Sequence, residues 1–349
     1  MRLNFKTMIA AAGLMAVSWS SAHALEAGAL PQSKAGVLIG ASAGVPPPGI
    51  YMFNQVFTYQ GNIAGPITNT IGTKTGFQAA VDVQGFLFVP GWTFLGATYD
   101  AVLVQPFVME NFGSPINVQS SGAHNTYIVP VELSWNLGNS GFAVKTGLGI
   151  YVPDGTQNGA SATSGLRTGT ANTGDPYWTF QPEIIVSYLK DGWNLSAAIY
   201  AEFNTRNSIT QYQSGDILHA DFTATKTIGK WTFGPVAYYY GQVSSDSCSS
   251  TVCLATYPTV PGVAPGGTLG NAARSNVWAV GGLVGYNFGP AALSVWATQE
   301  VSAKASNPTA LALTGGDNSI TARGATVFAT LSYRLWGPEE PAKAPMFHK

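Results

Sequence analysis

The chain has 349 residues, of which 9% are charged and 46% hydrophobic, and its formal net charge at pH 7 is −1. An ordinary soluble domain is about 25% charged, so the composition argues against a soluble enzyme, and the near-neutral charge gives no reason to expect nucleic acid as a partner. No run reaches the length of about 18 apolar residues that a membrane helix needs. The remaining classes are a transmembrane β-barrel, which the 41 Gly, 15 Tyr, 17 Phe and 9 Trp favour, and a secreted soluble β-protein.

The first 24 residues predict a cleavable export signal. Arg2 and Lys6 form a basic start, residues 8–17 are apolar or small, and Ala-His-Ala at 22–24 is a small-x-small cleavage site. We therefore expect cleavage after Ala24, a mature chain that begins at Leu25, and location in a bacterial outer membrane.

Residues 25–48 form a segment rich in Gly, Ala and Pro that ends in Pro46-Pro47-Pro48. The segment either hangs in the periplasm or folds into the barrel lumen as a plug. Its few charges favour the lumen.

The main signal is a two-residue period in about twelve segments of the mature chain. In 193–204, Trp193, Leu195, Ile199 and Phe203 share one face, while Asn, Ser, Tyr and Glu side chains share the other. A polar face with ionisable groups beside a wholly apolar face is unsuited to a sandwich core but suits a wet lumen and a lipid surface. The fold class is therefore all-β, an antiparallel up-and-down transmembrane barrel over 49–336.

The connections support this prediction, because tight turns alternate with long polar loops. Short links at 90–91, 138–141, 190–192, 229–230 and 289–291 predict periplasmic turns. Trp92, Trp193, Trp231 and Trp336 are expected in the periplasmic girdle, and residues 337–349 form a periplasmic tail. The expected strands are 50–60, 76–89, 92–104, 125–137, 142–153, 177–189, 193–205, 216–228, 231–243, 276–288, 292–304 and 323–336.

Within 127–137, strict alternation places Tyr127, Val129 and Val131 outward, and Glu132 and Ser134 inward. Pro130, Pro182 and Pro235 interrupt predicted strands and remove ladder donors, so bulges or kinks are expected there.

The lumen face is where a solute would bind. A barrel of about twelve strands encloses only a narrow path, and aromatic faces along it favour a small hydrophobic or aromatic solute. The same side chains could equally be filler. The expected inward ionisable groups are Asp82, Glu132, Lys145, Glu183, Glu202, Asp221, Glu300, Lys304 and Arg334. The predicted solute path comprises Phe86, Phe88, Tyr200, Tyr238, Tyr240, Trp296 and Phe328 with Glu132, Glu202 and Arg334.

Cys248 and Cys253 lie together in the longest loop, so an oxidising compartment favours a disulfide between them, with free thiols as the alternative. No His accompanies them, so no metal site is expected. No cofactor is indicated.

Catalysis is not expected. His219 and Asp221 share one strand face, as many lumen residues do, and no Gly-x-Ser-x-Gly motif is present. A solvated polar pair is the simpler interpretation.

Several short motifs resemble those of an outer-membrane barrel family associated with the meta-cleavage pathway of phenol degradation. These are Gly-Val-Pro-Pro-Pro-Gly-Ile-Tyr at 44–51 with Phe-Thr-Tyr at 57–59, Trp-Thr-Phe-Gly-Pro-Val-Ala-Tyr-Tyr-Tyr at 231–240, and Gly-Tyr-Asn-Phe at 285–288. The resemblance implies a barrel that takes up aromatic or other hydrophobic compounds, with outer-membrane lipid and a small solute as partners, and it transfers no catalytic residue. Alternatives are a narrow pore for small polar solutes and a structural or surface-binding barrel. The sequence leaves the oligomeric state open.

Overall fold

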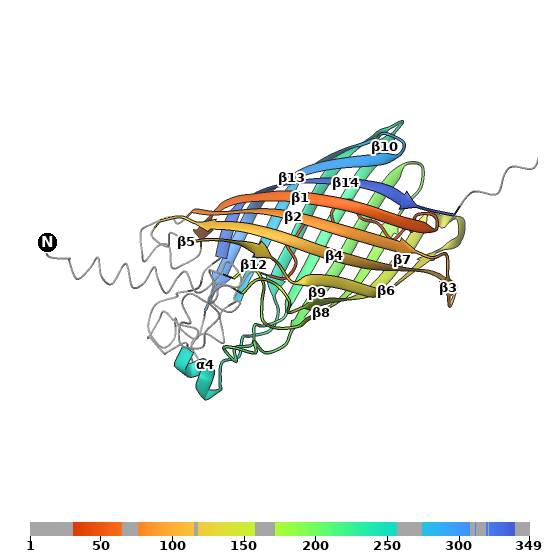
Figure 1. The fold of residues 1–349 in the computed structure, drawn as a ribbon. Helices are drawn as coiled ribbons and strands as arrows, with labels where there is room; N and C mark the ends of the chain where they lie inside the picture. The colour runs from red at the N-terminus through yellow and green to blue at the C-terminus, as the bar shows by residue number, and fades with distance from the viewer. Residues whose placement is uncertain are drawn as a thin grey trace, which may run out of the picture.

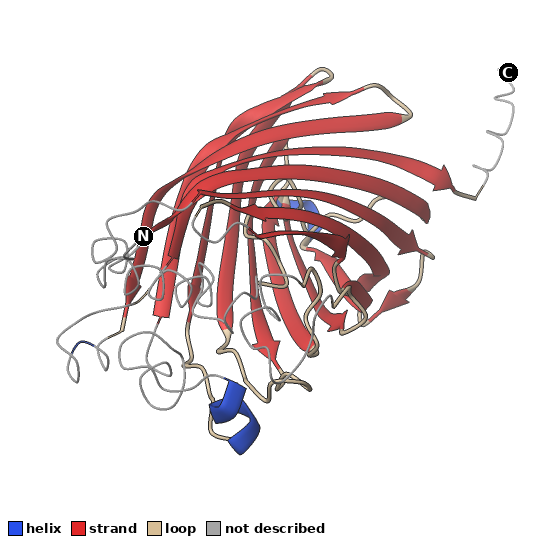
Figure 2. Ribbon diagram, turned by 60° about the vertical axis from the view of Figure 1, so that its left-hand side comes forward, coloured by secondary structure: helices blue, strands red, loops and turns tan. Residues whose placement is uncertain are grey.

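The computed structural model describes residues 31–64, 76–114, 118–157, 172–256, 274–307, 311, 319 and 321–338. The expected signal peptide and the tail from residue 339 lie outside the described residues. The described chain forms a single closed wall of strands, seen from the side in Figure 1 and obliquely in Figure 2.

Twelve antiparallel strands make the wall, and each pairs with its neighbour in the chain. The last strand closes the cylinder by pairing with the first, from Ile50 opposite Trp336 to Ala64 opposite Thr321. Closure satisfies the backbone groups that lipid could not, and the all-β barrel prediction is confirmed. The wall strands are β1 (Gly49–Ala64), β2 (Gly76–Val89), β4 (Ala97–Phe112), β6 (Thr126–Asn136), β7 (Phe142–Val152), β8 (Thr179–Tyr188), β9 (Trp193–Asn204), β10 (Ile217–Ile228), β11 (Trp231–Gln242), β12 (Arg274–Asn287), β13 (Ala291–Ser306) and β14 (Thr321–Trp336).

Four small elements accompany the wall: β3 (Thr93–Phe94), β5 (Val118–Ala123), the 3-10 turn η1 (Gly138–Ser140) and the helix α4 (Thr251–Thr256). The helix stands at the end of the barrel that carries the long connections, opposite the tight turns (Figure 1). Among the described residues, no helix is long and apolar enough to cross a membrane.

The tight-turn end follows the sequence prediction, with glycine at most of the left-handed backbone positions. The β8–β9 turn has positive φ at Asp191 (54°) and Gly192 (77°), and the β10–β11 turn has φ 61° at Gly229. A side chain on Gly192 would come within 2.6 Å of the carbonyl oxygen of Thr227, so the chain requires glycine there.

The third strand was placed wrongly. It was expected at 92–104 but spans Ala97–Phe112, while Thr93–Phe94 folds back on its beginning as β3. Positive φ at Leu95 (49°) and Gly96 (78°) makes a second reversal just after the expected turn. The strand then continues at the other end, where β5 pairs with it.

The strict alternation expected in β6 was also wrong. The β6–β7 register shifts between Ile128 and Glu132, around Pro130, and the hydroxyl of Tyr99 donates to the Pro130 carbonyl (2.8 Å). This bulge confirms the disruption expected at Pro130, and it lets Val129 and Glu132 both point inward.

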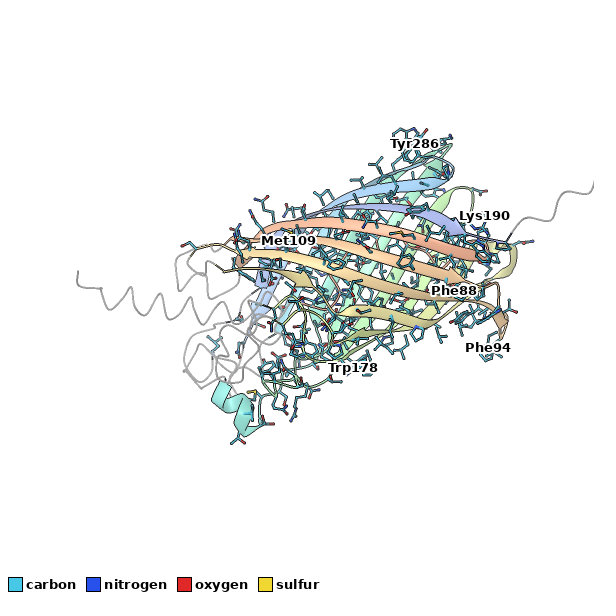
Figure 3. The ribbon with its side chains drawn as sticks, in the orientation of Figure 1. Phe88, Phe94, Met109, Trp178, Lys190 and Tyr286 are labelled. Carbon is cyan, nitrogen blue, oxygen red and sulfur yellow. A yellow bond between two sulfur atoms is a disulfide. The ribbon has the colours of Figure 1, made fainter. Side chains whose placement is uncertain are left out.

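The outer surface is largely apolar, whereas the interior holds buried polar and charged side chains beside an aromatic cluster. On β8 and β9 the outward side chains include Ile184, Val186, Leu195, Ile199 and Phe203, all more than 40% exposed. Phe88, Phe94, Met109, Trp178 and Tyr286, labelled in Figure 3, project from the outside of the wall. The two faces thus match lipid outside and a polar interior.

Candidate functional site: the barrel interior

The interior is partly filled by residues 31–44, here called the inner segment, which bonds to inward side chains of the wall. The backbone nitrogens of Gln32 and Ser33 donate to the two carboxylate oxygens of Glu202 on β9 (3.2 and 2.9 Å). Glu202 is fully buried, and His219 of β10 lies 2.9 Å from its Oε1. A buried carboxylate with several donors is well satisfied.

The contacts continue along the inner segment. Asp221 accepts hydrogen bonds from the backbone nitrogens of Gly36 and Leu38, both at 2.9 Å. The nitrogen of Gly40 donates to the Thr223 hydroxyl (2.8 Å). Ser187 on β8 accepts from Ala43 in the same way (2.8 Å). Polar side chains from β8, β9 and β10 therefore bind the backbone of the inner segment, most of whose own side chains are small or apolar.

Close packing explains the glycine at position 36 of the inner segment. Gly36 has φ +94°, and a Cβ there would lie 3.0 Å from Cδ1 of Tyr238. The indole nitrogen of Trp296 donates to the Gly36 carbonyl (3.2 Å). Trp296 in turn stacks on Phe328, with ring centroids 4.9 Å apart. Tyr238, Trp296 and Phe328 thus form the surface on which the inner segment packs.

One cation of the inner segment sits in an aromatic and acidic cluster. Lys34 Nζ lies 3.7 Å from Glu300 and donates to the Tyr238 hydroxyl (3.0 Å), and it stands 4.6 Å from the centre of that ring. The hydroxyls of Tyr59 and Tyr238 both donate to Glu300 (2.9 and 2.8 Å). The lysine charge is therefore balanced inside the barrel.

The inner segment and the residues that join it to β1 run from one end of the barrel to the other. Near the tight turns the Arg334 guanidinium donates to the carbonyl of Pro48, just before β1. Near the long connections, ring nitrogens of His124, in the link between β5 and β6, lie 2.6 Å from the Thr173 carbonyl oxygen and 3.2 Å from that of Gln32. Burial lowers the pKa of His124, while these carbonyl contacts oppose that change.

A second buried charge cluster lies on β4, β6 and β7. Lys145 Nζ is 3.1 Å from Asp100 and 3.1 Å from Glu132. All three side chains are at least nine-tenths buried. A buried lysine between two carboxylates is stable only while both partners remain.

Between the inner segment and the wall lies a cavity of about 520 Å³. Apolar side chains of β2 and β4 make one wall of the cavity. Polar groups of β6, β7 and β8, the strands that follow β4 around the barrel, make the wall next to it. The apolar wall comprises Val81, Val83, Leu87, Val102, Val104 and Val108, and the polar wall Glu132, Lys145, Gln181 and Glu183. The inner segment supplies a third side through residues 31–34 and 37–42. The cavity is thus amphipathic. Aromatic side chains also line it, namely Phe53, Phe57, Tyr59, Phe77, Tyr127, Tyr151, Tyr240 and Trp296.

The predicted path residues separate into three groups. Tyr240, Trp296 and Glu132 line the cavity. Tyr200, Tyr238, Phe328 and Glu202 are buried inward without lining it. Tyr200 stacks on His219 with centroids 4.6 Å apart. Arg334 is an exposed residue at the barrel end. Most of the predicted aromatic side chains therefore support the inner segment.

Two predicted path residues were wrong. Phe86 and Phe88 are 39% and 41% exposed on the outside of β2, because Val81, Val83 and Leu87 are the ones that face the cavity. The prediction assumed that the polar side of β2 is the lumen side. In the structure that polar side faces outward and carries Asp82, which was also expected inside.

Lys304 is likewise exposed rather than inward. The β12–β13 register shifts between Trp278 and Ala279, and beyond it Ala303 is the residue that packs against the interior cluster. Bulges of this kind reverse the face of every later residue in a strand.

The sequence did not identify Lys34 or Asp100 as interior groups. Lys34 lies in a segment without secondary structure, where no period reveals direction. Asp100 falls in the strand whose boundaries were misplaced.

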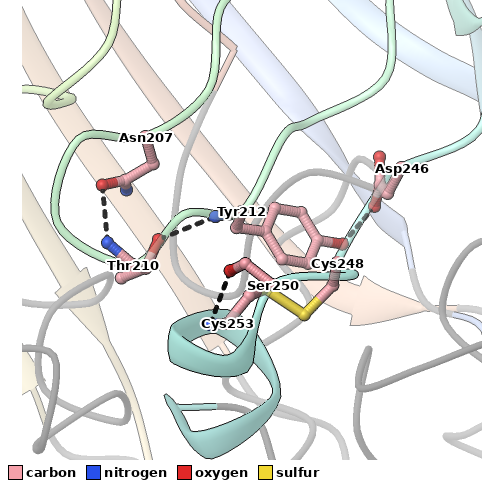
Figure 4. Close-up of a disulfide and its surroundings, with 7 residues drawn as sticks. All are labelled: Asn207, Thr210, Tyr212, Asp246, Cys248, Ser250 and Cys253. Atoms are coloured by element: carbon pink, nitrogen blue, oxygen red, sulfur yellow. Dashed lines mark hydrogen bonds between the residues drawn. A yellow bond between two sulfur atoms is a disulfide. The ribbon is translucent and has the colours of Figure 1, made fainter.

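The structure joins Cys248 and Cys253 by a disulfide, with Cα atoms 5.6 Å apart, in the loop between β11 and β12 (Figure 4). Tyr212 packs with this pair, and its hydroxyl donates to Asp246 (2.5 Å). The cluster belongs to the long-connection end of the molecule.

Three solved structures show how far the fold resembles known ones. The COG4313 outer membrane channel from Pseudomonas putida F1 superposes with TM-score 0.58 at 10% identity, over 84% of this chain and 98% of that one. The translocator domain of the autotransporter NalP from Neisseria meningitidis gives 0.44 at 9% identity over 83% and 90%. The Pseudomonas putida toluene transporter TodX gives 0.38 at 8% identity over 91% and 96%. The first of these likenesses supports the fold.

No curated protein matches the sequence. A family model does match, over residues 60–312, which is most of the barrel. The chain belongs to the family described as "Putative MetA-pathway of phenol degradation".

Proposed function

We propose that this protein is an outer-membrane channel through which small hydrophobic or aromatic compounds enter the cell passively. The observation that carries the proposal is the cavity of about 520 Å³ with its aliphatic wall on β2 and β4. Its volume is typical of small-molecule sites, and an apolar cavity of about 150 Å³ is enough to hold benzene. The link between the family and phenol degradation supports the same solute class.

The two walls suit a solute with an apolar body and one polar group. Val83 and Val104 offer apolar contact area, while Gln181 and Glu132 on the polar wall offer hydrogen-bond partners. A purely polar solute would leave the aliphatic wall wet, and would gain little from it.

We further propose that residues 25–48 act as a plug inside the barrel. The support is the set of backbone hydrogen bonds from the inner segment to Glu202, Asp221, Thr223 and Ser187. Passage then requires the segment to shift, because it forms one side of the cavity. The segment 1–24 acts as the export signal, and cleavage after Ala24 is part of the same proposal.

The test is equilibrium binding, because phenol and toluene cross bilayers unaided. Purified protein in detergent is titrated by calorimetry with toluene, phenol, a long-chain fatty acid and a neutral sugar. The expected result is saturable binding of the aromatic compounds and none of the sugar. Sugar flux into liposomes without any aromatic preference would instead indicate a narrow polar pore.

A matched pair of variants locates the site. Val83→Thr with Val104→Thr puts two hydroxyls on the cavity wall and should weaken toluene binding about tenfold or more, because a buried hydroxyl without a partner costs about 1–3 kcal/mol. Val186→Thr with Val327→Thr makes the same change on the outer face, where both valines are exposed, and should leave binding unchanged. Equal loss in the two variants would contradict the assignment of the cavity.

A further inference from the structure

The outer face of the barrel is not uniformly apolar, since β1, β2 and β4 carry polar side chains at the level where the other strands carry aliphatic ones. Gln84 on β2 lies directly opposite Asn54 on β1 and Gln105 on β4, so three amides form one row across three strands. Asp82 is joined to this row by a 2.6 Å hydrogen bond from the Asn54 side chain. We call Asn54, Asp82, Gln84 and Gln105 the polar outer patch.

The direction of these side chains follows from their neighbours. Asp82 is flanked across the sheet by Val56 and Phe107, which are 43% and 45% exposed on the outside. The residues on either side of Asp82 along β2, Val81 and Val83, line the cavity instead. The patch therefore lies on the surface opposite the lumen.

The patch sits within the apolar belt rather than at its edge. On β9 the exposed Trp193 and Phe203 mark the ends of the apolar run. Asp82 lies six positions along β2 from the exposed Phe88, which Figure 3 shows near the tight-turn end. With a rise of about 3.3 Å per residue and a tilt of about 40°, that separation corresponds to about 15 Å of depth within a belt of about 25 Å.

Within the patch, the Gln105 amide already donates to the carbonyl oxygen of His124 (2.9 Å) and accepts from the Thr126 hydroxyl (2.7 Å). Hydrocarbon would leave two of the other groups, Gln84 and Asp82, unsatisfied. The Gln84 amide makes no hydrogen bond with any residue that the structure describes, and within the same ranges only one oxygen of Asp82 is bonded. Polar and charged groups on the lipid face of a barrel are costly, and most so at mid-depth. Something with polar groups of its own is needed to cover them.

We propose that the polar outer patch is the contact surface between two copies of this chain in the membrane. The Gln84 amide carries both donors and acceptors and the second oxygen of Asp82 is an acceptor, so the two residues are complementary to the same two residues of a copy related by a two-fold axis, the commonest symmetry of homo-oligomers. The Gln84 amide of one copy is a suitable donor to Asp82 of its partner. Lipid chains offer neither donor nor acceptor. The outer faces of β8 and β9 carry the apolar side chains that suit lipid, whereas the polar outer patch does not.

Cysteine crosslinking in the membrane tests this surface directly. The two native cysteines are bonded to each other and no free thiol is described, so crosslinking would report on the introduced cysteine alone. Gln84→Cys should give a covalent dimer with a short bifunctional reagent, while Ile199→Cys, an outward residue of β9, should remain monomeric. Equal crosslinking of both variants, or none of either, would overturn the proposal.

A second variant separates the contact from the fold. Asn54→Leu with Asp82→Leu replaces the hydrogen-bonded pair by lipid-compatible side chains, so the barrel should fold at least as stably by heat-induced unfolding on gels. In the Gln84→Cys background this variant should reduce the dimer yield at least tenfold. A dimer yield that persists would show that the polar groups do not make the contact.

Discussion

The backbone nitrogen of Gly36 lies 2.9 Å from an Asp221 carboxylate oxygen, and that carboxylate also receives the nitrogen of Leu38. One side chain of β10 thus binds two backbone donors, two residues apart, of a segment that contains only turns. Because the donors are main-chain groups, these bonds fix the position of the inner segment without requiring particular side chains in it.

Loss of this carboxylate should loosen the inner segment. Asp221→Ala removes two charge-assisted hydrogen bonds, each contributing about 1.5–3 kcal/mol, so open states become more frequent. We expect a rise in the open fraction of single channels in planar bilayers. Glu110→Gln is the control, because Glu110 faces the cavity but bonds to Ser120 rather than to the inner segment. An equal rise in both variants would point to lumen charge rather than to the segment.

Gly36 is expected to tolerate no side chain. In Gly36→Ala the new Cβ meets Tyr238 at 3.0 Å while φ stays at +94°, a conformation that costs a non-glycine residue about 1–3 kcal/mol. Limited proteolysis should cut the inner segment faster in this variant. Ala41→Gly, at a half-buried position of the same segment outside the cluster around Tyr238, serves as the control. Unchanged proteolysis of Gly36→Ala would mean that the segment seats elsewhere.

The fold could be predicted because few folds other than a barrel are compatible with a strand period of two that is repeated along the chain between glycine-rich turns. The same period failed locally for two physical reasons. At Pro130 in β6 and at Val301 in β13, which has no partner in the β12–β13 register, a bulge reverses the faces, and no periodic pattern contains that information. In β2, polar side chains were taken to mark the lumen, whereas Asp82 and Gln84 face outward. The cavity itself arises where a segment without any period meets the wall, so its shape was out of reach of the sequence.

The cluster around Lys145 should show the energetics of a buried ion pair. Lys145→Met leaves Asp100 and Glu132 facing each other without a cation, and should lower the free energy of unfolding by about 3–5 kcal/mol. Adding Asp100→Asn and Glu132→Gln removes the stranded charges and should restore most of that loss. Urea unfolding in lipid vesicles measures all three proteins. If the triple variant is no more stable than the single one, packing of the lysine chain matters more than its charge.

The two carbonyl contacts of His124 lead to a pH prediction. Burial lowers the pKa of His124 in the folded protein, whereas the unfolded chain binds the proton near its ordinary value of about 6.5. As pH falls through about 6.5, the unfolded state takes up a proton first, so the free energy of unfolding decreases until pH passes the folded-state pKa. His124→Gln removes this component, and the stability of the unmodified protein relative to the variant should therefore fall between pH 8 and pH 5. A relative stability that rises on acidification would show that the imidazolium is favoured, donating to the carbonyls of Thr173 and Gln32 together and tightening the inner segment at low pH.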